Sequence, residues 1–161
     1  MKTNSQLGSQ NQMSLLANKI AFVTGAGSGI GRAGAIAMAQ QGARVIVTDL
    51  DVQKSTQVAN EIISKGHNAT SYGLDVLDDI ALKEIIDETV KTFGNIDILH
   101  SHAGYQTEGN LEEVSIEGMD LSWKLNVRSH FIASRAVVHH MRKQGGGSII
   151  ITASNSGIQY D

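Results

Sequence analysis

Short apolar runs rich in β-branched residues alternate with longer amphipathic stretches along this chain. The short runs predict five strands, at residues 20–24, 44–49, 69–72, 96–99 and 148–152. Between them, apolar residues recur at helical spacing, which predicts helices at residues 52–65, 80–93 and 117–143. Strands separated by helices of this length are typical of βαβ units and of a parallel sheet.

The first and fifth runs, IAFVT and IIIT, are almost wholly apolar and do not alternate with polar residues. Strands of a parallel sheet have this pattern when helices cover both faces of the sheet. We therefore predict an α/β fold, a doubly wound parallel sheet with five strands present, over residues 15–161. Residues 1–14 are polar, and we expect them to form a disordered leader.

Composition and charge exclude several classes of function. The 161 residues are 41% hydrophobic and 18% charged, with a net charge of −3 and scattered Lys and Arg, so neither nucleic acid nor an acidic membrane is an expected partner. No apolar stretch reaches the roughly 18 residues of a membrane span, and the N-terminus lacks the apolar centre of a secretory signal. The absence of cysteine excludes disulfides and thiolate metal sites and fits a cytoplasmic protein.

The first predicted strand leads directly into a glycine-rich segment, TGAGSGIGRAGA. A strand, a glycine turn and a helix N-terminus together form an anion site, because free N–H groups and the helix dipole both favour a phosphate. This arrangement is typical of the pyrophosphate site in a dinucleotide-binding, Rossmann-type sheet.

Other glycine motifs fit less well, although a glycine turn without a ligand remains an alternative. A P-loop needs a Gly-Lys-Ser/Thr triplet, which the chain lacks. A GxGxxG spacing begins only at Gly29, too far beyond the strand. A GxGxG spacing beginning at Gly25 would suit a Rossmann-type methyltransferase that uses S-adenosylmethionine, but Val23 and Thr24 stand where such enzymes usually carry an acid.

Asp49 ends the second predicted strand, eighteen residues beyond Gly31. A carboxylate at this position can accept hydrogen bonds from the hydroxyls of an adenosine ribose. It would also repel a 2′-phosphate, which favours NAD over NADP. The alternative is that Asp49 caps a helix or lies solvated in a loop, as Asp51 is expected to do.

Residues 24–31, TGAGSGIG, match the TGxxxGxG pattern of the short-chain dehydrogenases/reductases. Further landmarks of that family follow in order: Asp75-Val76 after the third strand, DIL and then AG within residues 97–104, Asn126 in LNVRSHF, and Ser154 after the fifth strand. The chain therefore resembles this family over essentially residues 15–161.

The resemblance implies an NAD(H)-dependent oxidoreductase that interconverts an alcohol and a ketone or aldehyde and forms a homo-oligomer at full length. In such an enzyme the hydroxyl of Ser154 donates a hydrogen bond to the substrate oxygen, and Asn126 supports a water-linked proton relay. A dinucleotide-binding module without catalysis is the alternative. Besides Asp49, the cofactor-binding residues implied are Thr24, Gly25, Ser28, Gly29, Ile30, Gly31, Asp75, Val76, Ala103 and Gly104.

The chain departs from the family pattern at two places. Ser101 and His102 replace the usual paired asparagines of the fourth strand. The YxxxK motif that carries the family's proton donor is absent: Tyr72 and Tyr105 lack a lysine at the fourth position beyond them, and Tyr160 lies too near the serine. We therefore expect an N-terminal fragment of a longer enzyme, inactive alone, with the apolar fifth strand left as an edge.

The remaining histidines and the single tryptophan have structural interpretations. His100 and His102 form an HxH pair that can bind zinc, but no third ligand is identifiable, and we expect packing at the strand end and no metal. His139 and His140 are expected on different faces of a solvated helix end. Trp123 is expected to pack against a neighbour.

Overall fold

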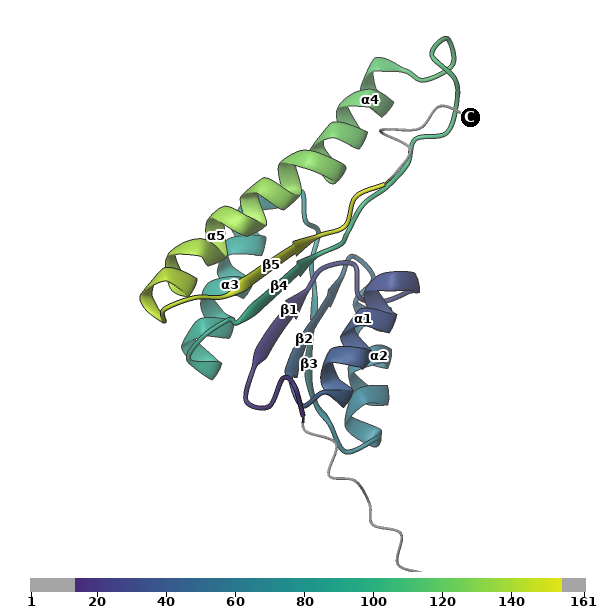
Figure 1. Cartoon of the computed structure of the whole chain (residues 1–161). Helices are drawn as coiled ribbons and strands as arrows, with labels where there is room; N and C mark the ends of the chain where they lie inside the picture. The colour runs from purple at the N-terminus through teal and green to yellow at the C-terminus, as the bar shows by residue number, and fades with distance from the viewer. Residues whose placement is uncertain (1–13, 155–161) are drawn as a thin grey trace, which may run out of the picture.

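The five strands form one parallel sheet in the order β3-β2-β1-β4-β5 in the computed structural model of the protein, which describes residues 14–154 (Figure 1). The elements, in chain order, are β1 (Ile20–Val23), α1 (Gly29–Gln40), β2 (Arg44–Asp49), α2 (Val52–Ser64), β3 (Asn68–Gly73), α3 (Asp79–Phe93), β4 (Ile98–Ser101), α4 (Ile116–Trp123), a π-helical turn η1 (Lys124–Arg128), α5 (Ser129–Lys143) and β5 (Ser148–Ile151). The predicted fold class, a doubly wound parallel α/β sheet, is confirmed.

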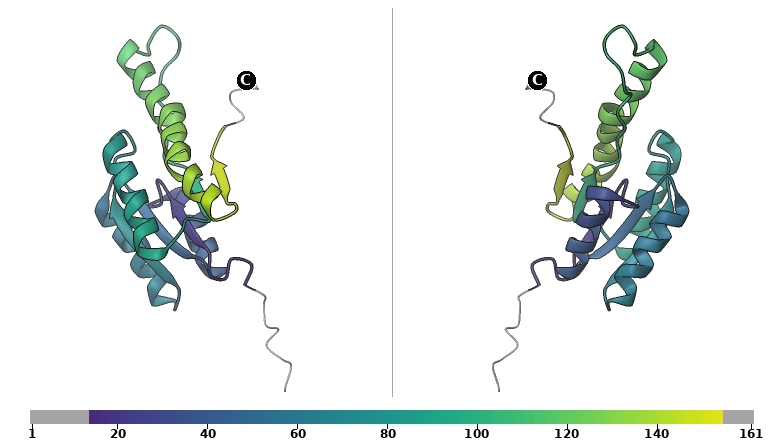
Figure 2. Two further views of the ribbon diagram at one scale, coloured as in Figure 1. Left: turned by 90° about the vertical axis from the view of Figure 1, so that its left-hand side faces the viewer. Right: turned by 90° about the vertical axis from the view of Figure 1, so that its right-hand side faces the viewer.

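Helices cover both faces of the sheet, with α1 and α2 on one side and α3 and α5 on the other (Figure 2). The residues of β1 divide between the two faces: Ala21 and Val23 belong to the core against α1 and α2, whereas Ile20 and Phe22 belong to the core against α3 and α5. Because successive side chains of a strand point to opposite faces, a strand covered on both sides must be apolar throughout, as the sequence indicates.

Local signals set the ends of the helices beside the sheet. The carboxylate of Asp51 accepts hydrogen bonds from the Gln53 and Lys54 amides and caps α2. Asp78 caps α3 in the same way, and α3 ends at Gly94, which has a left-handed backbone. Each N-cap carboxylate accepts hydrogen bonds from amides of the first helical turn that have no partner within the helix.

Two predicted elements differ from the observed ones by more than one residue at an end. The single helix expected at residues 117–143 is divided by the π-helical turn η1 into α4 and α5. Apolar spacing did not reveal the turn because one inserted residue leaves the helical period of the sequence the same before and after it. The fourth strand begins at Ile98 and extends to Ser101, two residues beyond the prediction, because pairing with β1 and β5 holds His100 and Ser101 in the sheet.

Two expectations about helical side chains are wrong. Trp123 is 57% exposed, so no neighbouring element within residues 14–154 buries it. His139 and His140 do not point apart, because their ring centroids lie only 3.7 Å from each other.

Residues 1–13 of the predicted leader lie outside the described residues, as do residues 155–161. Ser14 is described, and its hydroxyl donates a hydrogen bond to the Gln41 carbonyl at the end of α1. Among the helices of residues 14–154, none combines the length and the apolar character that crossing a membrane requires.

Candidate functional site

An open cleft of about 1110 Å³ lies at the edge of the sheet where the parallel strands have their carboxyl ends. Ligands of open α/β sheets bind at this edge, beside the point where the strand order reverses. Here the order reverses at β1, whose neighbours are β2 and β4. The predicted site residues that line the cleft are Gly25, Ser28, Gly29, Asp49, Asp75, Val76, Ala103, Gly104, Asn126 and Ser154.

Thr24, Ile30 and Gly31 do not line the cleft. Thr24 is buried, and its hydroxyl oxygen accepts hydrogen bonds from the amides of His102 and Ala103 at 3.0 and 3.1 Å. It thereby ties the end of β1 to the turn that follows β4. Ile30 is 67% exposed on the first turn of α1. We infer that Thr24 and Gly31 shape the site from behind its surface.

Gly31 holds the glycine turn against the first turn of α1. A Cβ atom at this position would lie 2.2 Å from the Gly25 carbonyl oxygen and 2.7 Å from the His102 ring. Any larger residue would push these groups apart, so the close approach explains why the sequence needs glycine here. The result is a turn that brings backbone amides to the mouth of the cleft at a helix N-terminus.

Asp49 stands at the end of β2, and its carboxylate faces the glycine turn. Oδ2 accepts a hydrogen bond from the Gly27 amide at 2.8 Å, and Oδ1 accepts one from the Asp51 amide at 3.0 Å. The helix-capping alternative is wrong for Asp49, because Asp51 caps α2. A carboxylate has about four lone-pair positions, so each oxygen of Asp49 retains capacity for a ligand hydroxyl.

Asp75 and Val76 follow β3 along the same edge of the sheet. Asp75 is exposed, and its Oδ1 accepts a hydrogen bond from the Leu77 amide at 2.9 Å. Val76 is 7% exposed and belongs to the core between the sheet and α3. The pair thus offers one polar and one apolar group to the cleft.

Asn126 lies on the π-helical turn η1 and holds the loop that follows β4. Its Oδ1 accepts from the Tyr105 amide at 2.9 Å, and its Nδ2 donates to the Tyr105 carbonyl at 2.6 Å. A Cβ atom on Gly104 would lie 2.7 Å from Asn126 Oδ1. The side-chain amide of Asn126 therefore holds the Gly104-Tyr105 backbone in place. One N–H donor and one acceptor lone pair of this amide remain available for a further hydrogen bond.

Ser154 is the last described residue, and its exposed side chain lines the same cleft as Asn126. The chain leading to it continues the sheet beyond β5, because the Thr152 amide donates to the Ser101 carbonyl at 3.2 Å. The rigid sheet therefore delivers Ser154 to the edge where the glycine turn and Asn126 already lie.

A buried polar network stands where the family has its paired asparagines. The Thr152 hydroxyl lies 3.2 Å from His100 Nε2 and 2.9 Å from His102 Nδ1, and the Ser101 hydroxyl lies 2.7 Å from His130 Nδ1. Both replacements thus have hydrogen-bond partners: Ser101 has one on α5, and His102 has one just beyond the end of β5. The expected packing of His100 and His102 at the strand end agrees with these contacts.

Sequence reasoning did not single out Thr152 or His130. The register of β4 and β5 pairs His100 with Ile150 and therefore brings His102 opposite Thr152. Knowledge of that pairing would have identified Thr152, whereas the approach of His130 depends on how α5 packs over the sheet.

Burial lowers the pKa of all three histidines of this network. Desolvation is the main cause for His100, His102 and His130, since it disfavours the charged imidazolium. A charge on His102 would further lower the pKa of His100 and of His130. The three rings therefore act as neutral hydrogen-bonding groups at neutral pH.

The strand order, the glycine turn and the position of the cleft define a Rossmann-like α/β protein with its ligand site at the carboxyl edge of the sheet. Residues 19–160 match the family model described as short chain dehydrogenase. The chain belongs to the short-chain dehydrogenase family, and the resemblance seen in its motifs is confirmed.

Relatives of this chain include oxidoreductases of bacteria and fungi. An uncharacterized oxidoreductase of Thermotoga maritima is 39% identical over 140 residues, which cover 87% of this chain and 55% of that relative. A versicolorin reductase of Emericella nidulans is 39% identical over 142 residues, which cover 88% of this chain and 53% of that relative. The chain thus spans about half the length of these curated relatives.

The fold also matches solved structures closely. A 7α-hydroxysteroid dehydrogenase, solved in complex with NADH and 7-oxo glycochenodeoxycholic acid, superposes with a TM-score of 0.88 and 31% identity. The match covers 92% of this chain and 58% of that structure. The shared part therefore includes nearly all of the sheet and helices described above.

Proposed function

We propose that this chain forms the cofactor-binding part of an NAD(H)-dependent oxidoreductase that interconverts an alcohol and a ketone or aldehyde. When bound, a nicotinamide dinucleotide accepts or donates the hydride of such a reaction. The glycine turn would hold the pyrophosphate, and Asp75 and Val76 would contact the adenine. The backbone of Ala103 and Gly104 would line the cofactor next to the glycine turn, since a Cβ atom on Gly25 would lie 2.9 Å from Ala103 Cα.

The position of Asp49 carries this proposal. Its carboxylate lies at the end of β2 within the cleft and is held there by the Gly27 amide of the glycine turn. A ligand whose phosphates occupy the turn would therefore have its adjacent ribose next to a negative charge. Ribose hydroxyls can donate to that carboxylate, whereas a 2′-phosphate would be repelled, which favours NAD over NADP. The solved relative that contains NADH supports a nicotinamide dinucleotide.

Ser154 and Asn126 would serve the substrate side of the cleft. The hydroxyl of Ser154 would donate a hydrogen bond to the carbonyl or alkoxide oxygen of the substrate and so stabilise charge on it. Asn126, braced on the Tyr105 backbone, would orient water in a proton relay with its remaining amide positions. Hydride transfer also needs a proton donor matched to the substrate oxygen, typically worth about 10²–10⁴ in rate. We expect the 161-residue chain alone to bind NADH without turnover.

A melting and fluorescence titration with NADH, NADPH and S-adenosylmethionine tests the proposal. We expect NADH to raise the melting temperature and to bind more tightly than NADPH, with no effect of S-adenosylmethionine. Failure of NADH to bind or stabilise the folded chain would refute the proposed cofactor. Membership of the short-chain dehydrogenase family decides against the methyltransferase alternative.

The non-catalytic alternative is tested on the protein at the full length of its relatives. Oxidation of a panel of secondary alcohols with NAD would support the enzyme, and the Ser154→Ala variant should then lose most of kcat while still binding NADH. Binding of NADH without oxidation of any alcohol would favour a dinucleotide-binding module.

We further propose a homo-oligomer at full length and a cytoplasmic location. Large apolar side chains are exposed on α4 and α5, where Met119, Trp123 and Phe131 are 57, 57 and 62% exposed. An exposed apolar surface of this kind is typical of a protein interface. Size measurement of the full-length protein, with Phe131→Glu as the disrupting variant, tests the assembly.

A further inference from the structure

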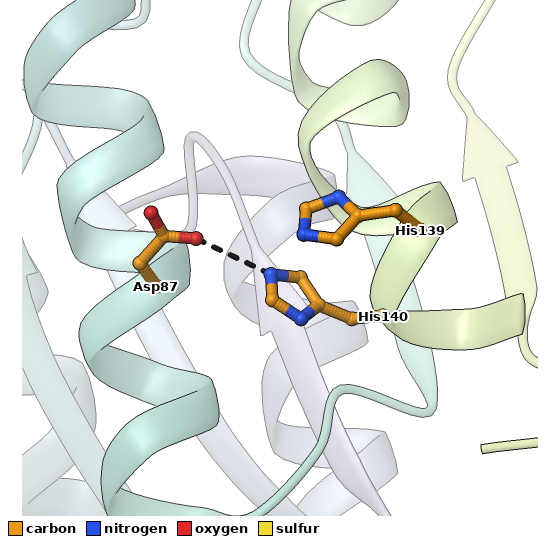
Figure 3. A group of neighbouring side chains, drawn as sticks. All are labelled: Asp87, His139 and His140. Atoms are coloured by element: carbon orange, nitrogen blue, oxygen red, sulfur yellow. Dashed lines mark hydrogen bonds and ion pairs between the residues drawn. The ribbon is translucent and has the colours of Figure 1, made fainter. Parts of the chain in front are cut away.

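Two histidines and one aspartate form a cluster between α3 and α5, away from the cleft (Figure 3). Asp87 comes from α3, and His139 and His140 come from the last turns of α5. Helices of βαβ units run opposite to their strands, so the end of α5 lies toward the sheet edge opposite the cleft. The cluster is therefore separate from the candidate cofactor site.

The side chains of the cluster already converge. One ligand atom from each residue lies within 4.8 Å of the other two. His140 Nε2 is 3.2 Å from Asp87 Oδ1, and the two imidazole centroids are 3.7 Å apart with their planes tilted by 42°. Figure 3 shows both rings turned from α5 toward the carboxylate on α3.

This spacing is close to what a tetrahedral ion needs. Bonds of about 2.0–2.1 Å from a zinc ion place neighbouring ligand atoms about 3.3 Å apart. Rotation of exposed side chains can bring atoms now within 4.8 Å to that spacing without moving either helix. His139 is exposed, and the Asp87 side chain is 40% exposed, so an ion can reach both from solvent.

We propose that Asp87, His139 and His140 bind a divalent transition-metal ion that joins α3 to α5, with water in its remaining positions. Two imidazoles and one carboxylate suit Zn²⁺ and its neighbours in the transition series, whereas Mg²⁺ and Ca²⁺ prefer oxygen ligands throughout. Three protein ligands with an open position are a recurrent zinc arrangement. The proposal is independent of the proposed oxidoreductase activity.

Nearby positive charges limit how tightly the ion is held. Lys83 forms an ion pair with Oδ2 of Asp87, which leaves Oδ1, the oxygen that faces His140, for the metal. Lys143, one turn beyond His139 on α5, adds a further positive charge. We therefore expect a dissociation constant for Zn²⁺ in the micromolar range, weaker than that of a closed structural site.

The test is a Zn²⁺ titration of the untagged chain by calorimetry, with Co²⁺ absorption as a probe of coordination geometry. We expect one ion per chain and a rise in melting temperature of roughly 5–10 °C at about a hundredfold excess over the dissociation constant. His139→Ala and Asp87→Asn should each weaken binding at least tenfold. His67→Ala, which removes a histidine in the turn before β3, should leave binding unchanged.

His140→Gln provides a second variant, because its amide can keep a hydrogen bond to Asp87 while losing the imidazole ligand. Loss of Zn²⁺ binding in this variant with an unchanged melting temperature in chelator supports the site. Absence of binding by the wild-type chain below millimolar Zn²⁺ would overturn the proposal. Binding that survives both His139→Ala and Asp87→Asn would also overturn it, because the ion would then lie elsewhere.

Discussion

Individual residues of the cleft are positioned by hydrogen bonds to backbone groups of neighbouring segments. The Thr24 hydroxyl accepts hydrogen bonds from two amides of the turn after β4, and the Asp49 carboxylate accepts one from the Gly27 amide. The side-chain amide of Asn126 forms hydrogen bonds with both the amide and the carbonyl of Tyr105. Each bond joins parts of the chain distant in sequence. The candidate site is therefore built before any ligand arrives, which lowers the ordering cost of binding.

The Asp49→Ala variant tests the proposed ribose contact. Loss of charged hydrogen bonds worth about 1.5–3 kcal/mol should weaken NADH binding roughly 10- to 100-fold. Loss of the negative charge should also reduce the discrimination against NADPH. Parallel fluorescence titrations with the two cofactors measure both effects. Asp51→Asn, which retains the cap of α2, is the control, and unchanged affinities in Asp49→Ala would remove Asp49 from the site.

The buried histidines predict a dependence of stability on pH. Histidines of the unfolded chain titrate near pH 6.5, whereas burial lowers the pKa values of His100, His102 and His130 in the folded state. Below about pH 6.5 the unfolded state then binds more protons, so stability falls as the pH decreases. Melting temperatures measured from pH 7.5 to pH 5 should fall progressively.

The His102→Asn variant isolates this contribution, because it removes one titrating group from the network. Its melting temperature should fall less steeply over the same pH range than that of the wild-type chain. Equal slopes in wild type and His102→Asn would contradict the assignment. Cationic partners lower the pKa values of the carboxyls of Glu61, Asp79 and Asp87. Measurements above pH 5 therefore avoid the range in which these ion-paired carboxyls become protonated.

At the scale of elements, the π-helical turn η1 is one of the helical segments that line the site. It joins α4 to α5 and carries Asn126 toward the loop after β4. π-Helical turns insert one residue into a helix and occur frequently at functional sites. Here the added residue lets Asn126 face the loop while Ser129 and His130 remain buried.

The Asn126→Ala variant should loosen the loop after β4. Loss of two side chain–backbone hydrogen bonds, about 1 kcal/mol in total for exposed groups, should lower the melting temperature by about 2–4 °C. The amide of Tyr105, which donates to Asn126, should exchange with deuterium faster. Lys124→Ala on the same turn is the matched control, and unchanged exchange at Tyr105 in Asn126→Ala would refute the bracing role.

At the scale of the whole molecule, helices cover both faces of the sheet, but one edge of the sheet is an exposed apolar strand. β5 lies at the end of the strand order in the described part of the chain, and Ile149, Ile150 and Ile151 are 39, 48 and 49% exposed. An apolar strand at a sheet edge offers unpaired backbone groups to another chain. The sequence expectation of an apolar edge agrees with this arrangement.

The 161-residue chain should therefore self-associate in a concentration-dependent way. Light scattering at increasing protein concentration measures this, and Ile150→Lys should reduce it because a charge on the edge opposes pairing of strands. Ile63→Lys, at a position 50% exposed on α2, is the control for added charge alone. A monomeric wild-type chain at all concentrations would contradict the prediction.

Much of the fold was predictable because its signals are local. Apolar runs predicted all five strands and the helices at residues 52–65, 80–93 and 117–143. Asp49 was predicted from its place at the end of a strand, whereas Ser154 and Asn126 were implied by the family resemblance. The mistakes arose where contacts between distant segments decide the outcome. His100 joins β4 through pairing with β1 and β5, and Ser101 joins it through pairing with β5. The rings of His139 and His140 on α5 converge on Asp87 of α3.

The sequence by itself determined the parallel α/β architecture, the glycine turn and the family, because each depends on residue type and spacing along the chain. Only the tertiary structure decided that Thr152 bridges His100 and His102, that Asp49 holds Gly27 and that Asp87 meets two histidines of α5. These contacts depend on the register of paired strands and the packing of helices. The spacing of residues along the chain does not determine register or helix packing, because both are set only when the segments pack into one core.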